Sequence, residues 1–207
     1  MIPGPPELFK CPSCDEILSR GSIMSGNTFG SRLFSDGKTI SPMLPDFPQI
    51  SECLGCDEIF WLEGNEVDEA DLVYPDKIYV QRAKFLNAFK LNAAIHRGLA
   101  KNLAQEIYIR RHIVWAINDR VRSNEKIFPD DNFKNIWDEN QSFLIDLLNE
   151  NNINHRFLLI EMYRNRGDFY KAYNLLMPIY TRKYMGIKEA FKFHIENKNQ
   201  KLFEIII

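Results

Sequence analysis

Two Cys-x-x-Cys pairs constrain this chain more than any other feature of its sequence. The first pair spans residues 11–14 and the second spans residues 53–56, and together they contain all four cysteines among the 207 residues. Each turn of this kind presents two sulfurs at the spacing of neighbouring ligands on a tetrahedral metal, so two turns supply a complete ligand set. The pattern predicts one structural metal site, with zinc as its metal, formed by Cys11, Cys14, Cys53 and Cys56.

The sequence around the two pairs repeats. Each pair is followed by Asp-Glu-Ile, at residues 15–17 and 57–59, and each lies between short segments of extended type. This arrangement resembles the zinc-ribbon class, in which two knuckle hairpins share one metal. The resemblance implies a small β module whose four thiolates close the site and leave no position for water or substrate. Because the 38-residue spacer between the pairs is longer than that of the usual ribbon, we expect an inserted hairpin within it.

Three other interpretations of the cysteines stay open. Iron can occupy the same four-thiolate site in place of zinc. A thioredoxin-like redox site is disfavoured, because such a site has one pair between a strand and a helix, whereas both pairs here lie in chain rich in Gly and Pro. The last alternative is four buried thiols that bind no metal.

The predicted β module covers residues 1–66, and an acidic linker is expected at residues 67–78. Within the module, Asp-Gly at residues 36–37 predicts a hairpin turn between residues 28–34 and 38–40. So small a module has a marginal core and needs a staple such as a metal. Its few large apolar side chains are Phe29, Phe34, Phe47, Phe60 and Trp61.

From residue 79 onward the apolar residues follow helical spacing, so we expect an all-α domain over residues 79–207. Asp130 or Asp131 can cap the third helix, and Asp168 can cap the fifth. The apolar tail, residues 203–207, must pack as a strand or as a last helical turn. The six predicted helices cover about 79–96, 101–122, 132–149, 154–167, 169–183 and 187–198.

A more specific pattern lies in residues 159–176. Leu159 and Tyr163 precede a Gly-Asp-Phe turn at residues 167–169, and Ala172 and Leu176 follow it. The segment resembles the tetratricopeptide helix-turn-helix, in which a small residue lets two helices approach closely and the Gly adopts a conformation that side chains resist. The resemblance implies a groove that binds peptides or proteins. The expected fold class is therefore α+β, with a small zinc-ribbon-like β module followed by a tetratricopeptide-like helical domain, as in a broad group of bacterial proteins.

Five residues of the second predicted helix form a candidate ligand surface. At about 100° per residue, four of them share one side of the helix next to its apolar stripe, and the fifth lies beside them. Two guanidiniums around an indole can bind a carboxylate or a phosphate. The alternative is that the indole belongs to the core and that the polar groups bond to helix ends or to Asp119. The candidate residues are Tyr108, Arg111, Trp115, Asn118 and Arg122.

Charge is distributed unevenly along the chain. Residues 1–78 contain five Lys or Arg and fourteen Asp or Glu, which gives −9, whereas residues 79–207 contain twenty-one and fourteen, which gives +7. An acidic cysteine module is poorly suited to binding a phosphate backbone. Because residues 79–207 are basic, nucleic-acid binding stays an alternative to protein binding.

The sequence lacks the motifs of the common enzyme classes. It contains neither a Walker loop nor His-Glu-x-x-His, and His96, His112, His155 and His194 are scattered. We therefore expect a non-catalytic adaptor with a protein or peptide partner, and the alternative is an enzyme whose site lies in the loop 21–48 beside the metal. No apolar run approaches the ~20 residues of a membrane helix. The N-terminus lacks the features of a secretory signal, so a cytoplasmic location is expected.

Overall fold

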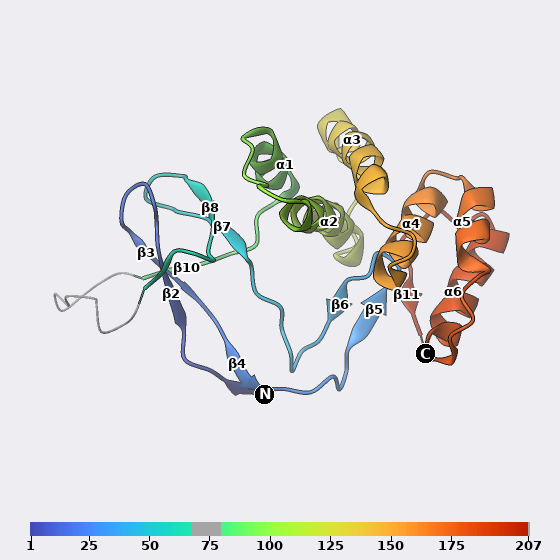
Figure 1. The fold of residues 1–207 in the computed structure, drawn as a ribbon, viewed down its shortest axis with the longest axis horizontal. Helices are drawn as coiled ribbons and strands as arrows, with labels where there is room; N and C mark the ends of the chain where they lie inside the picture. Colours follow the sequence, from blue (N-terminus) through green and yellow to red (C-terminus); the bar gives the residue numbers. More distant parts are fainter. Residues whose placement is uncertain (68–79, 207) are drawn as a thin grey trace. The chain divides into compact units, whose positions relative to one another are not determined.

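The computed structural model describes residues 1–67 and 80–206. Within these residues most strands come first and six α-helices follow, so the predicted α+β class is confirmed (Figure 1). The chain divides into two compact units. The N-terminal unit consists of Met1–Gly30 and Ser41–Ala100, and the helical unit consists of Ser31–Ile40 and Lys101–Ile207.

This division differs from the predicted domains in two places. The hairpin segment 31–40, expected as an insertion in the β module, belongs to the helical unit. Residues 80–100, expected in the helical domain, belong to the N-terminal unit. The predicted linker, residues 67–78, lies outside the described residues except for Val67. The chain therefore passes between the units three times, after residues 30, 40 and 100.

Two β-hairpins form the frame of the N-terminal unit. Strand β2 (Glu7–Lys10) pairs antiparallel with β3 (Ile17–Arg20), and β7 (Ile50–Glu52) pairs antiparallel with β8 (Ile59–Trp61). One Cys-x-x-Cys turn connects the strands of each hairpin, as the zinc-ribbon resemblance implies. The hairpins share one buried cluster, made of Phe9, Cys11, Leu18, Cys53, Phe60, Leu62 and Ala83.

Four further strands belong to this unit. Strand β9 (Glu66–Val67) pairs with β2, and β10 (Gln81–Arg82) runs parallel to β3, which gives a four-stranded sheet in the order β10-β3-β2-β9. Strands β1 (Ile2–Pro3) and β4 (Ile23–Ser25) form a separate antiparallel pair. The position of β10 matters most, because it brings residues from beyond the linker to the first hairpin.

The first helix is shorter than predicted. Helix α1 covers Ala88–His96, because Asn87 caps it by accepting a hydrogen bond from the Lys90 N–H, and part of the preceding chain is used by β10. Phe89 and Ala93 of this helix are exposed. The buried residues of α1 are Ala88, Leu91 and Ala94.

The helices of the helical unit follow the predicted order, but the fifth ends at Leu176 and not near residue 183. Four of these helices begin after a residue whose side chain accepts a hydrogen bond from a backbone N–H of the first turn. These N-cap residues are Asn102, Asp130, Asn152 and Asp168. None of the helices in the described residues is long and apolar enough to span a membrane. Their bounds are α2 (Leu103–Arg122), α3 (Asp131–Leu147), α4 (Ile153–Asn165), α5 (Phe169–Leu176), the short 3₁₀ turn η2 (Arg182–Tyr184) and α6 (Met185–Glu196).

A small sheet joins the inserted hairpin to the C-terminal tail. Strand β5 (Arg32–Phe34) pairs with β6 (Thr39–Ile40) on one side and with β11 (Glu204–Ile205) on the other, antiparallel in both cases (Figure 1). Arg32 and Glu204 form an ion pair of 2.6 Å across it. Within the tail, Glu204–Ile205 therefore form a strand. Phe203 and Ile205 contribute to the apolar core that is formed by Ile160, Ala172, Leu176, Ile179, Phe191, Ile195, Phe203 and Ile205.

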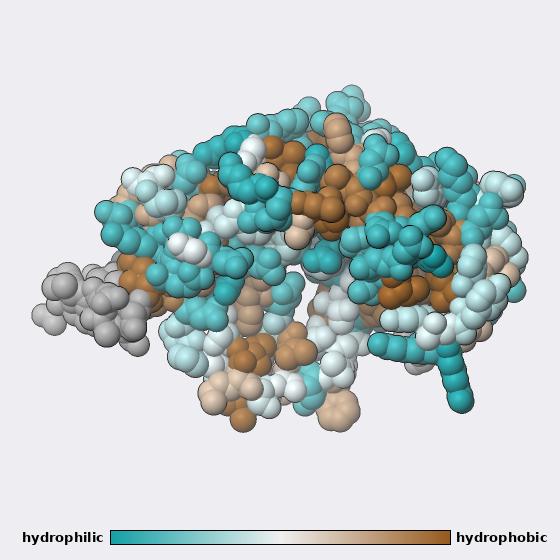
Figure 2. Space-filling view, viewed as in Figure 1, coloured by the Kyte–Doolittle hydropathy of each residue, from teal (hydrophilic) through white to brown (hydrophobic). Residues whose placement is uncertain are grey.

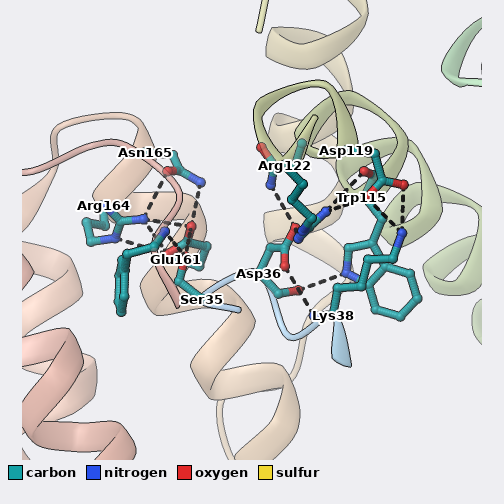
Figure 3. Close-up of polar contacts among 11 residues, drawn as sticks. Ser35, Asp36, Lys38, Trp115, Asp119, Arg122, Glu161, Arg164 and Asn165 are labelled. Carbon is teal, nitrogen blue, oxygen red and sulfur yellow. Dashed lines mark hydrogen bonds and ion pairs between the residues drawn. The ribbon is translucent and has the colours of Figure 1, made fainter. Parts of the chain in front are cut away.

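The turn between β5 and β6 buries a carboxylate. Asp36 has no exposed surface, and its Oδ2 accepts hydrogen bonds from Arg122 and, at 2.8 Å, from Asn118 (Figure 3). Its backbone carbonyl accepts a third bond, at 3.0 Å, from Trp115 Nε1. Gly37 has a φ of 77°, so the predicted Asp-Gly turn is confirmed. Three side chains of α2 therefore hold this turn.

The neighbouring residue of the same turn contacts α4. Ser35 Oγ donates a hydrogen bond of 2.8 Å to Glu161, which also binds Arg164 at 2.7 Å, and both charged side chains are fully buried (Figure 3). Burial raises the pKa of Glu161, and the Arg164 guanidinium acts in the opposite direction. One turn thus contacts two helices, α2 through Asp36 and α4 through Ser35.

Arg122→Met should lower the free energy of unfolding of the helical unit by about 3–5 kcal/mol, because Asp36 would stay buried without its counter-charge. Lys134→Met is the matched control, since Lys134 forms an exposed ion pair with Asp138 on α3. The control should cost less than about 1 kcal/mol. Urea unfolding followed by circular dichroism measures both, and equal losses would contradict the importance of the buried pair.

Candidate metal centre

The four cysteines lie in two turns of the same construction. In the first turn the Cys11 N–H donates to the Glu16 carbonyl at 2.8 Å, and the Asp15 N–H donates back to the Cys11 carbonyl at 3.1 Å. In the second turn the same two bonds recur between the equivalent residues of the segment 53–58, both at 2.8 Å. The repeated Asp-Glu-Ile of the sequence therefore corresponds to a repeated backbone conformation.

The two turns bring all four sulfurs to one point. The Sγ atoms of Cys11 and Cys56 are 3.6 Å apart, those of Cys14 and Cys53 are 3.5 Å apart, and all four lie within 4.8 Å of one another. Four thiolates at about 2.3 Å from one zinc ion would be separated by about 3.8 Å in a tetrahedron. The cysteines are thus grouped as predicted, and their geometry fits a tetrahedral ion.

The electrostatics of this cluster also favour a cation. The Glu16 N–H lowers the pKa of Cys14, but the Cys56 sulfur, desolvation and the other two sulfurs raise it, to about 12. Four sulfurs at these distances therefore do not ionise together without a counter-charge. A bound divalent cation supplies that charge, and its binding releases the thiol protons.

A buried glutamine joins the two turns. Gln81 Oε1 accepts a hydrogen bond of 2.8 Å from the Leu54 N–H in the second turn, and its Nε2 donates to Glu16 in the first. Gly55 lies against the same Glu16 carboxyl group, and a Cβ at Gly55 would come within 2.8 Å of it. Sequence reasoning missed Gln81, because no local motif connects it to cysteines that lie in other segments.

Helix α1 places positive charge beside the second turn. Lys90 binds Glu52, which precedes the second cysteine pair, and Arg97 binds Glu58 at 2.9 Å just after it. Four thiolates around a divalent ion carry a net charge of −2, so neighbouring cations reduce the repulsion from the acidic residues. Each pair is partly exposed and contributes at most about 1 kcal/mol.

Part of the predicted ligand surface on α2 is used by the chain itself. The hairpin turn is held by three of these side chains. Arg122 and Asn118 bind the Asp36 carboxylate, and the Trp115 indole N–H donates to the Asp36 backbone carbonyl. Arg122 also binds Asp119 at 2.8 Å, in agreement with the alternative that these polar groups have structural partners. These side chains thus bind a carboxylate, as expected, but the carboxylate belongs to the same polypeptide.

The rest of that surface is an aromatic stack. The Tyr108 and His112 rings stack with their centroids 3.9 Å apart, and the centroids of the His112 and Trp115 rings are 4.6 Å apart. The guanidinium carbon of Arg111 lies 4.8 Å from the centroid of the Trp115 ring. Burial lowers the pKa of His112 to about 4, with Arg111 and Lys38 contributing, so this imidazole is neutral at pH 7. Ligand binding at Tyr108, Arg111 and Trp115 stays a prediction.

Cys53→Ser should abolish metal binding and unfold the N-terminal unit. Three thiolates do not complete the tetrahedral site, and the small apolar cluster around them is not sufficient to keep the unit folded without the metal. Metal content should fall from roughly one ion per chain to near zero. Ser13→Ala, in the other turn, keeps all four sulfurs and is the matched control. Elemental analysis and far-UV circular dichroism test this, and an unchanged metal content and spectrum in Cys53→Ser would contradict it.

Asp57→Gly should stabilise the metal-loaded N-terminal unit by up to about 1 kcal/mol, because a left-handed conformation costs residues with a Cβ more than it costs glycine. Asp57 has a φ of 57° and the equivalent Asp15 a φ of 64°. Asp57→Ala removes the same carboxylate but keeps a Cβ, so it should give no gain. Denaturant unfolding compares them, and equal stabilities of the two variants would rule out backbone strain as the cause.

The chain was compared with known protein families, curated proteins and solved structures. No protein-family model, curated protein or solved structure matches the chain. The resemblances to zinc ribbons and to tetratricopeptide units therefore rest on local residues, namely the two cysteine turns and the segment 159–176. The structure itself establishes an α+β chain with four cysteines clustered as in a metal site.

Proposed function

We propose that this chain binds zinc as a structural metal and acts as a non-catalytic adaptor, which binds another protein through its helical unit. The observation that supports zinc is the convergence of four sulfurs from two similar turns. A soft, four-thiolate set suits a tetrahedral ion and fills all its positions. An enzyme in the loop 21–48 would need an open position on the metal, so this ligand set disfavours that alternative.

A groove in the helical unit supports the adaptor role. It has a volume of about 500 Å³ and lies between α3, α4 and α5. Figure 2 shows hydrophobic side chains gathered on the face that α3 and α4 form. The groove combines the apolar Ile145, Leu148, Leu159 and Leu175 with the polar Glu150, Tyr163, Lys171 and Asn174.

The pair of helices behind this groove has the features that suggested a tetratricopeptide unit. Gly167 has a φ of 78°, Asp168 caps α5, and Ala172 is fully buried where the two helices pack. Leu159 and Tyr163 of α4 line the groove. A concave surface of this kind accommodates an extended or helical peptide segment, with apolar contacts at the floor and hydrogen bonds at the rim.

Asn174→Trp should weaken partner binding by about tenfold or more, equivalent to a loss of about 1.4 kcal/mol, because an indole at this exposed position fills the groove. Glu189→Trp places the same side chain on α6, outside the groove, and is the matched control. Quantitative affinity purification identifies partners, and titration with a purified partner gives the two affinities. Similar binding by both variants would remove the groove from the proposal.

Nucleic-acid binding is the competing outcome for the basic half of the chain. In that case the wild type would be retained on DNA or RNA at low salt and released steeply as the salt concentration rises. Asn174→Trp would then leave retention unchanged, since the groove has no cluster of cations. This combination of results would replace the adaptor role with nucleic-acid binding.

A further inference from the structure

We propose that peroxide converts this centre into two disulfides that cross between the turns, Cys11–Cys56 and Cys14–Cys53, so that the turns stay joined after the metal is lost. The inference rests on the proposed metal site and concerns its regulation. It would make the centre a redox-sensitive staple whose oxidised form is covalent.

The pairing follows from the positions of the sulfurs. The separations of 3.6 Å between the Cys11 and Cys56 sulfurs and 3.5 Å between the Cys14 and Cys53 sulfurs both join one turn to the other. Cys14 and Cys56 are exposed, whereas Cys11 and Cys53 are fully buried. An oxidant therefore reaches one sulfur of each crossing pair, and the buried sulfur of the other turn lies next to it.

The chemistry needs only a peroxide as oxidant. In the metal-loaded protein, in which all four sulfurs are thiolates, Cys14 attacks one peroxide oxygen, the O–O bond breaks, and the departing hydroxide takes up a proton to become water, which leaves a sulfenic acid. The Cys53 thiolate then attacks this sulfur, the S–S bond forms, and the expelled hydroxide takes up a second proton. Two thiolates, one hydrogen peroxide and two protons thus give one disulfide and two waters. Cys56 and Cys11 react in the same way with a second peroxide.

The crossing pattern has a structural consequence. The pairs are separated by 45 and 39 residues, so each disulfide closes a long loop and constrains the unfolded chain. Disulfides within each Cys-x-x-Cys turn would close loops of only a few residues and leave the turns unconnected. The crossing pattern therefore preserves the N-terminal unit after oxidation, with Gln81 still bonded to both turns.

The two patterns give different peptides after trypsin digestion. Trypsin cleaves after Lys10 and Arg20, so the first cysteine pair lies in peptide 11–20, and it cleaves after Lys38 and Lys77, so the second lies in peptide 39–77. The metal-loaded full chain is treated with hydrogen peroxide, remaining thiols are alkylated, and the unreduced digest is analysed by mass spectrometry. A chromogenic chelator measures the released zinc in parallel.

We expect release of roughly one zinc ion per chain, together with the two peptides linked to each other and tandem fragmentation that assigns Cys11–Cys56 and Cys14–Cys53. The same oxidation in concentrated urea is the control, because closure of the shortest loop should then favour disulfides within each peptide. Unlinked peptides from the folded protein, each lighter by two hydrogens, would overturn the inference, and so would retained zinc with free thiols. Absence of metal from the untreated protein would instead overturn the proposed metal site, and this inference with it.

Discussion

The buried ion pair between Asp36 and Arg122 attaches the hairpin 31–40 to α2 within the helical unit. Asp36 has no exposed side-chain surface, and that of Arg122 is 6% exposed. Moving two such charges out of water costs several kcal/mol each, and their attraction offsets this only when hydrogen bonds satisfy the remaining polar atoms. Asn118 and the Lys38 N–H donate such bonds to the Asp36 carboxylate, and Asp119 accepts one from the Arg122 guanidinium. Neither charge is tolerated there alone, so the hairpin turn has one position along α2.

The placement of this turn determines the arrangement around it. Ser35, one residue before Asp36, binds Glu161 of α4, and Lys38, two residues after it, binds Asp119 of α2 at 2.6 Å. The two helices are thereby connected through a segment that is distant from both in sequence. With the turn fixed, β5 presents its free edge to the C-terminal strand, and the three-stranded sheet follows.

Features that depend on neighbouring residues could be predicted from the sequence. The cysteine turns, the Asp-Gly turn and the caps at Asp130 and Asp168 are all of this kind, and the structure contains each of them. The start of α1 was missed although Asn87 is a recognisable cap, because apolar spacing was extended backward into a segment that forms β10.

Contacts between distant segments could not be predicted in the same way. The sequence indicated that Arg122 and Trp115 can bind a carboxylate, and it indicated a turn at Asp36, but 86 residues separate Asp36 from Arg122. No local periodicity reports such a pairing. The same holds for Gln81, which bonds to Leu54 from 27 residues away. The sequence therefore indicated which side chains could bind a carboxylate, and only the fold showed which carboxylate they bind.

The four-cysteine cluster and the buried ion pair belong to different units of one chain. The hairpin 31–40 is anchored in the helical unit by its own side chains and by β11, and none of these contacts includes a cysteine. The entropic cost of closing a flexible chain around the hairpin grows only slowly with chain length. Loss of the hairpin exposes buried charges of α2 and α4, so these ten residues of the N-terminal sequence stabilise the helical unit.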